Sequence, residues 1–299
     1  MRRKRNNTLT QNTYNGKVIG ITNAPSRLAA NGCWGFGEIT NAIRNGTAAL
    51  EETSLWPPNH LIVEYLVCAG GGNASQGAGG AGGKVEGADG LITLGVHACT
   101  VGAGAAPGGE SSIGSLYVSE GGGQGNANAG GSGAGGYYTQ GTFGEGIDGQ
   151  GNDGGSVHAV NQLSGGGGGG AGAAGSPTVN SRDGGNGGTG EASSISGSSV
   201  TYCGGGGGAS YTAEPGEGAS GGGGNGAEQG ANPTNGTANL GGGGGGAWDS
   251  TKGNGGSGIV IVRYKGDRVL DGGTDGTSGD YKIHTFTSTS NLGLGFAGS

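Results

Sequence analysis

Short hydrophobic segments, each bounded by polar or glycine-rich sequence, recur along the chain. The two clearest are residues 61–68 (LIVEYLVC) and residues 259–264 (IVIVRY). β-Branched and aromatic residues favour strands, and a strand that is apolar at successive positions is typically covered on both faces. We therefore predict a strand at each place, with the second buried on both sides. Shorter segments of this kind predict strands over residues 17–21, 91–94, 96–101, 115–118, 194–202 and 281–287.

One segment near the amino terminus has helical spacing. Ile39, Ala42 and Ile43 occupy positions i, i+3 and i+4 within residues 38–45, and Gly46 follows as a stop. We predict a short helix there. The apolar residues of region 1–60 are too few for an independent core. This region is therefore predicted to be an attachment segment that gains stability from a partner or from the rest of the chain.

Glycine dominates the middle of the sequence. It supplies 84 of 299 residues, of which six lie in residues 1–60 and eight in residues 265–299. With 31% hydrophobic residues, the chain cannot build a conventional apolar core of the size expected at this length. Disorder is the alternative reading of such a composition. The scarcity of Lys, Glu, Gln and Pro, together with the regular strand-like segments, favours an ordered structure.

Runs of glycine, such as residues 165–170 and 241–246, are poor α-helices and poor strands. We expect them to form extended three-residue helices of the polyproline-II type, bonded to one another through their backbones. The predicted fold class is therefore mostly non-regular and β, a polyglycine-II helix bundle flanked by short β-strands. The predicted division is an attachment segment (1–60), a glycine-rich domain (61–264) and an Asp/Gly-rich link with a short β segment (265–299).

Charge is unevenly distributed. The net charge is −7, yet residues 1–60 are net basic and begin with Arg2, Arg3, Lys4 and Arg5. These residues are either an arm that contacts nucleic acid or an acidic partner surface, or a solvated tail. The acidic remainder argues against nucleic acid as the main partner. We assign the basic residues, with Trp34 and Trp56, to attachment.

The sequence offers no catalytic or metal-binding constellation. Cys33, Cys68, Cys99 and Cys203 are far apart, and the four histidines are scattered without ligand spacing. We expect buried, unpaired thiols, as suits assembly in a reducing cytoplasm, and neither an enzyme nor a cofactor. No signal peptide precedes the chain, and its apolar segments are too short to span a membrane.

Bulky side chains between the glycine runs are the candidates for ligand binding. Exposed aromatic rings give large contact area at low entropic cost, and they suit sugars or protein surfaces. The alternative is that these rings pack over the edge of the glycine region and shield it. The candidates are Tyr137, Tyr138, Phe143, His158, Tyr211 and Trp248.

Six motifs follow one another between residues 61 and 264. They are VEYLVCAGGG (63–72), CTVGAG (99–104), GQGNDGG (149–155), SSISGSSVTY (193–202), GTAN (236–239) and GGSGIVIVRY (255–264). In this order they resemble the polyglycine-II type of glycine-rich domain in bacteriophage tail-fibre, spike and adhesin proteins. VIGITNAP (18–25) and NGCW (31–34) are similar to a segment that precedes such domains. Residues 281–287 are similar to a strand that opens a further β-unit, which here would be truncated or completed by another chain.

The resemblance implies a virion structural protein, a tail fibre or spike that binds the host cell surface. Residues 1–60 would attach it to other virion proteins in a symmetric assembly, and the loops between glycine runs would contact a host glycan or protein. An architectural role, as a capsid decoration or head-fibre protein, is the alternative. An ice-binding role would need a flat face of regularly spaced small residues, which the irregular loops contradict. The expected location is the virion, assembled in the host cytoplasm.

Overall fold

The computed structural model describes residues 12–14, 17–19, 60–93, 95–138, 142–158, 163–178, 182–248, 251–266 and 270–294. The chain divides into two compact units, Met1–Leu61 and Ile62–Ser299. In the first unit, β1 (Asn12–Tyr14) pairs antiparallel with β2 (Lys17–Ile19), which lies within one of the predicted strands. The helix predicted over residues 38–45 lies outside the described residues.

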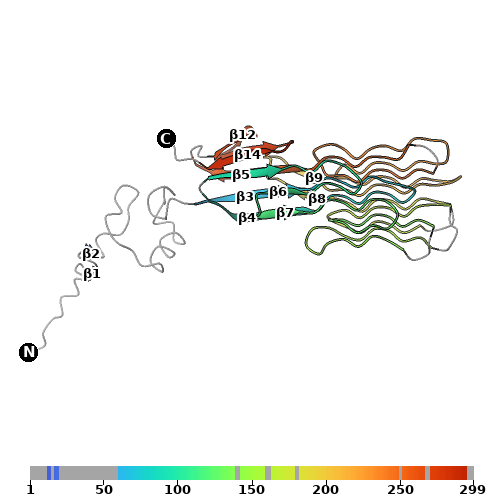
Figure 1. Ribbon diagram of the computed structural model, residues 1–299, viewed down its shortest axis with the longest axis horizontal. Helices are drawn as coiled ribbons and strands as arrows, with labels where there is room; N and C mark the ends of the chain where they lie inside the picture. Colours follow the sequence, from blue (N-terminus) through green and yellow to red (C-terminus); the bar gives the residue numbers. More distant parts are fainter. Residues whose placement is uncertain are drawn as a thin grey trace, which may run out of the picture. The chain divides into compact units, whose positions relative to one another are not determined.

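Two five-stranded sheets form one end of the second unit (Figure 1). The first has the order β12-β13-β10-β3-β4, and the second has the order β11-β14-β5-β6-β7. β10 pairs antiparallel with both β3 and β13, and β5 pairs antiparallel with both β14 and β6. The strands are β3 (His60–Cys68), β4 (Lys84–Thr93), β5 (Gly95–Thr100), β6 (Ser111–Ile113), β7 (Tyr117–Ser119), β10 (Ile259–Lys265), β11 (Leu270–Asp271), β12 (Thr274–Ser278), β13 (Tyr281–Phe286) and β14 (Ser290–Leu294).

The central strand β10 is buried on both faces, as its apolar run predicted. Val260 and Val262 are fully buried on one face, where they pair with residues of β3 and β13. Ile259 and Ile261 lie on the other face, in a second apolar cluster with Leu66. The hairpin of β8 (Glu191–Ser193) and β9 (Val200–Tyr202) supplies Tyr202 to that cluster and covers it.

Ionic contacts also hold this hairpin in place. The buried Lys84 ammonium lies 2.7 Å from Glu86 and 3.1 Å from Glu191, which begins β8. Burial lowers the pKa of Lys84, but the hydrogen bonds to both carboxylates outweigh it and leave the pKa raised. Arg263 donates to Glu64 of the neighbouring strand and to the carbonyl of Ser194 in the hairpin. The sheet and the hairpin are therefore joined by charge as well as by apolar packing.

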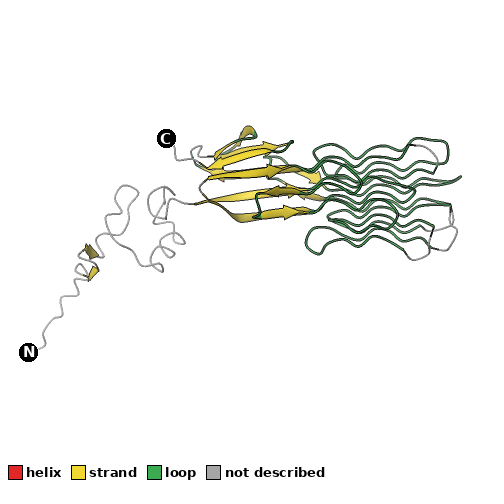
Figure 2. Ribbon diagram, in the orientation of Figure 1, coloured by secondary structure: helices red, strands yellow, loops and turns green. Residues whose placement is uncertain are grey.

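Extended glycine-rich segments run side by side beyond the strands (Figure 2). In residues 165–170, successive amides donate to three neighbouring segments in rotation, so every third residue bonds to the same neighbour. The acceptors, at 2.8–3.1 Å, are in order the carbonyls of Ala209, Gly136, Ser176, Gly206, Gly133 and Ala173. We call this region the glycine lattice. It comprises residues 69–83, 102–109, 121–136, 144–155, 164–176, 184–190, 203–209, 216–226, 234–247 and 253–258.

The interior of the glycine lattice has no room for side chains. A Cβ atom built on Gly168 would lie 2.0 Å from the carbonyl oxygen of Gly79, and one on Gly206 would lie 2.1 Å from that of Gly244. Ordering each residue costs about 1–2 kcal/mol, and each backbone hydrogen bond contributes about 0.5–1.5 kcal/mol net. These terms nearly cancel, so the packed sheets anchor a lattice that is close to balance by itself.

The predicted fold class is wrong. We expected a polyglycine-II helix bundle with a short helix beside it, but the residues that the structure describes contain no helix, and their regular structure is antiparallel β-sheet. The sheets are larger than predicted because β4 contains polar residues and glycines and because residues 270–294 add four strands. In the glycine runs, bonding to three neighbours in rotation produces neither an internally bonded helix nor a two-strand ladder.

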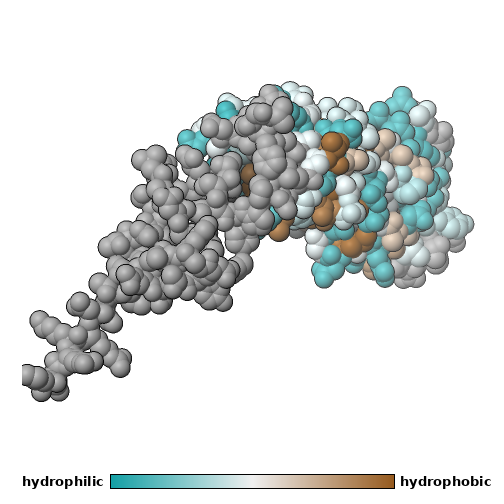
Figure 3. All heavy atoms as spheres, turned by 60° about the vertical axis from the view of Figure 1, so that its left-hand side comes forward, coloured by the Kyte–Doolittle hydropathy of each residue, from teal (hydrophilic) through white to brown (hydrophobic). Residues whose placement is uncertain are grey.

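The surface of the sheets carries separate apolar side chains. Ile62, Leu91, Val96 and Leu116 are exposed. On the face seen in Figure 3, hydrophobic residues appear as patches among hydrophilic ones. Residues 281–287 were expected to open a β-unit that is truncated or completed by another chain. In this structure β13 pairs within the chain, with β10 and β12.

Candidate binding surface

The glycine lattice ends in turns on the side away from the sheets (Figure 1). Backbone contacts bring several of these turns together. The amide of Ala209 donates to Gln76, and the amide of Ala247 donates to Ser75. Tyr137 forms a bridge with Gly165, and Ser164 forms one with Ser210. Segments from distant parts of the sequence therefore meet at this end, which we call the distal end.

Four aromatic rings contact one another at the distal end. The Trp248 ring lies 5.6 Å from Tyr137, with an interplanar angle of 82°, and 5.4 Å from Tyr211, with an angle of 74°. Tyr138 lies 5.7 Å from Tyr137 at 44°. Edge-to-face pairs of this kind stabilise by about 0.5–1.5 kcal/mol beyond the burial of their area. We call these four residues the distal aromatic cluster.

The chain holds Trp248 through polar contacts on both its backbone and its ring. The indole N–H donates to the carbonyl of Leu163 at 3.0 Å. The backbone carbonyl of Trp248 accepts from the Lys252 ammonium at 2.6 Å, and Lys252 also donates to the carbonyl of Ala247. The ring is thereby fixed relative to three segments of the glycine lattice, which limits the conformational entropy that binding would remove.

The cluster combines packed rings with an exposed one. Tyr137, Tyr211 and Trp248 are half-buried, whereas Tyr138 is 52% exposed. Tyr138 has a φ of 63°, in the left-handed region that non-glycine residues seldom adopt. Such conformations persist where the surroundings impose them, and they concentrate at functional positions. The exposed Leu163 lies beside the cluster through its contact with Trp248.

The phenol groups of the cluster are neutral donors and acceptors at ordinary pH. Burial, with a smaller contribution from the adjacent Tyr138, raises the pKa of Tyr137. An unperturbed tyrosine already titrates near pH 10. The cluster therefore offers apolar ring surface and hydroxyl groups to a ligand.

Four of the six predicted binding residues thus meet in one cluster, although the sequence placed them in separate loops. Phe143 is exposed in the segment that follows residues 139–141. His158 is exposed, and its backbone amide donates to the Thr178 hydroxyl at 3.0 Å. The predicted attachment residues, Arg2, Arg3, Lys4, Arg5, Trp34 and Trp56, lie outside the described residues.

Sequence reasoning missed the residues that support the cluster, Gln76, Leu163 and Lys252. One signal could have found Leu163. It stands just before the run at residues 165–170, as Trp248 stands just after the run at residues 241–246. A bulky residue at the border of a glycine run marks the end of a lattice segment. Gln76 and Lys252 carry no such signal.

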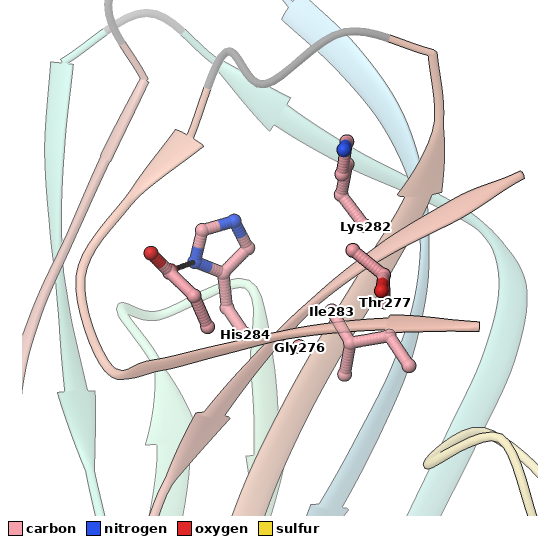
Figure 4. Close-up of a pocket in the computed structure, with 6 residues that line it drawn as sticks. Gly276, Thr277, Lys282, Ile283 and His284 are labelled. Atoms are coloured by element: carbon pink, nitrogen blue, oxygen red, sulfur yellow. Dashed lines mark ion pairs between the residues drawn. The ribbon is translucent and has the colours of Figure 1, made fainter.

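A shallow pocket in the sheets is the other recess of note (Figure 4). It is lined by β12 and β13, with Lys282 at its rim and the buried His284 beside it. His284 Nδ1 lies 2.9 Å from the carbonyl oxygen of Gly272 and 3.2 Å from Asp275, and the imidazole stacks on Tyr264. These contacts hold the ring between strands, so its role here is structural.

Two classes of site were searched for across the described ranges. No three His, Cys, Asp or Glu side chains gather there as metal ligands would. The same ranges contain no helix with the length and apolar content that crossing a membrane requires.

Comparison with known proteins gave one finding. A family model described as a glycine-rich domain matches residues 47–265, which is most of the chain. No curated protein and no solved structure matches it.

Proposed function

The chain belongs to the family of glycine-rich domains, and we propose that it displays a ligand-binding surface on a bacteriophage virion, as a tail fibre or spike. The distal aromatic cluster is the observation that carries this proposal. Four rings from three turns are gathered at the end of a backbone-bonded lattice, where a cell surface would meet them. The motif order between residues 61 and 264 adds the virion context by resemblance.

The physical design of the second unit suits display. Lattice segments bond to several neighbours, so a turn at the distal end is held by the whole lattice. Rigid rings on a rigid support lose little conformational entropy when they bind. In this proposal the sheets and lattice hold the rings away from the virion.

The remaining parts of the proposal concern assembly. Residues 1–60, with their basic start, attach the chain to other virion proteins. Virion proteins occur in symmetric sets, so several copies present their distal ends together, and binding by many copies multiplies a weak single-site affinity. The protein is proposed to act on the virion after assembly in the host cytoplasm.

Cell binding by the full chain tests the proposal. The labelled protein is applied to a panel of bacterial strains and measured by flow cytometry, beside a variant carrying Tyr138→Ala and Tyr211→Ala. Leu116→Ala, which removes an exposed apolar side chain from the sheets, is the matched control. We expect binding to some strains, loss in the double variant and no change in the control. If no strain is bound by the folded protein, the architectural role as a capsid decoration or head-fibre protein replaces this proposal.

A further inference from the structure

Resting on the proposed function, we propose that the ligand of the distal aromatic cluster is an uncharged cell-surface glycan. A sugar ring has an apolar face of C–H groups and a rim of hydroxyls. The cluster offers the complement, an exposed ring at Tyr138 and half-buried rings that stand nearly perpendicular at Trp248. One sugar face can stack on an aromatic ring while its hydroxyls exchange hydrogen bonds with neighbouring phenol groups.

The charge around the cluster selects a neutral ligand. The four rings are uncharged at ordinary pH. The nearest cation with printed contacts, Lys252, directs its ammonium to the backbone carbonyls of Ala247 and Trp248. The chain as a whole carries a net charge of −7. An anionic polysaccharide would meet long-range repulsion here without a guanidinium or ammonium group placed to offset it.

The size of the cluster favours a sugar over a protein surface. A stable protein interface buries about 800 Å² on each partner. An aromatic side chain can bury about 150–250 Å², but three of these four rings are already half-buried against one another. The surface left for a ligand is on the order of a few hundred Å², which matches one or two sugar rings better than a protein interface.

The backbone of Tyr138 supports the same conclusion. Its φ of 63° holds an aromatic residue in a conformation that costs about 1 kcal/mol or more. The Tyr137–Tyr138 ring contact then keeps the exposed ring next to its packed neighbour. A ring fixed in this way is ready for stacking before the ligand arrives.

The experiment uses the full chain and a strain that it binds. Cells are treated with periodate, which cleaves the vicinal diols of sugars, or with a protease, and binding is measured again. We expect periodate to abolish binding and protease to leave it. The purified neutral polysaccharide of that strain should compete with the cells, whereas a sialylated polysaccharide should not.

Two variants at one position refine the test. Tyr138→Ala should weaken binding to the purified polysaccharide by at least tenfold, and Tyr138→Phe, which keeps the ring, by much less. Binding that survives periodate but not protease would overturn the glycan assignment and leave the proposed function standing, with a protein as receptor. Competition by the sialylated polysaccharide would overturn the neutral class. Absence of binding to every untreated strain would instead refute the proposed function.

Discussion

The rings of Tyr65 and Tyr117 stack with their centroids 3.8 Å apart, and they join β3 of one five-stranded sheet to β7 of the other. The Tyr65 ring lies over β4, where Cβ atoms built on Gly87 and Gly90 would come within 2.7 and 2.6 Å of it. The Tyr117 hydroxyl accepts a hydrogen bond from the amide of Leu91 at 2.7 Å. Glycines in β4 thus make room for the ring pair that closes one side of the sheets.

Replacing Tyr117 tests this closure. Tyr117→Phe removes the hydrogen bond to Leu91 and should lower the free energy of unfolding by about 1 kcal/mol. Tyr117→Ala also removes the stacked ring and should lower it by about 2–3 kcal/mol. Urea unfolding followed by circular dichroism measures both. Equal values for the two variants would mean that the ring contact contributes nothing.

Adding one methyl group inside the glycine lattice should be far more harmful than adding it to a strand. Gly168→Ala places a Cβ 2.0 Å from the carbonyl oxygen of Gly79. We expect it to destabilise the protein by about 4 kcal/mol or more, or to prevent folding. Gly276→Ala in β12 is the matched control, because the nearest atom to its Cβ is 3.7 Å away. Thermal unfolding of the two variants should differ by at least ~10 °C, and similar midpoints would contradict the lattice as described.

Removing the charge of Lys84 should release the β8–β9 hairpin. Lys84→Met leaves the Glu86 and Glu191 carboxylates close together without their shared cation. Breaking a buried ion pair in this way costs about 3–5 kcal/mol, and the partial exposure of both carboxylates places the expected value near the lower limit. Hydrogen exchange should speed up in β8 and β9 more than in β10. A triple variant that adds Glu86→Gln and Glu191→Gln should recover part of the loss, and failure to recover any would point to packing alone.

Alkaline pH should destabilise the protein through its buried thiols. Burial raises the pKa of Cys99 from its ordinary value of 9.0 to about 12, and burial also raises the pKa of Cys68. Between these values the unfolded state has lost protons that the folded state keeps, so stability is present below pH 9 and is lost as pH rises toward 12. Each thiol contributes about 1.4 kcal/mol per pH unit. Urea midpoints at pH 8, 9.5 and 11 should fall less steeply for Cys99→Ala than for the parent. Parallel curves would contradict a protonated Cys99.

The strands that could be predicted from the sequence are those with an unbroken apolar run. Burial of β10 on both faces followed directly from its run of Ile and Val, which needs cover on each side. Residues 194–202, expected as one strand, instead hold a turn at Gly197 and pair back as a hairpin, because a φ of 95° there reverses the chain. β4 escaped prediction because its glycines serve Tyr65, a partner on another strand.

The candidate site could be predicted in its members but not in its arrangement. Aromatic residues between glycine runs stood out by composition, yet nothing local indicated that Tyr137 and Tyr211 would both contact Trp248. That meeting depends on how the lattice segments are ordered, and glycine runs carry no side chains from which to read their neighbours. Phe143 and His158 matched the same composition rule, which cannot separate cluster members from other exposed residues.

Unfolding the glycine lattice exposes many peptide groups and few hydrocarbon side chains. Newly hydrated apolar surface raises the heat capacity of the unfolded chain, whereas hydrated polar surface lowers it. The heat-capacity increment of unfolding should therefore fall below the ~12–15 cal/mol/K per residue that is usual for globular proteins. A small increment flattens the curve of stability against temperature, so the geometry of the distal rings should change little between a cold environment and a warm one.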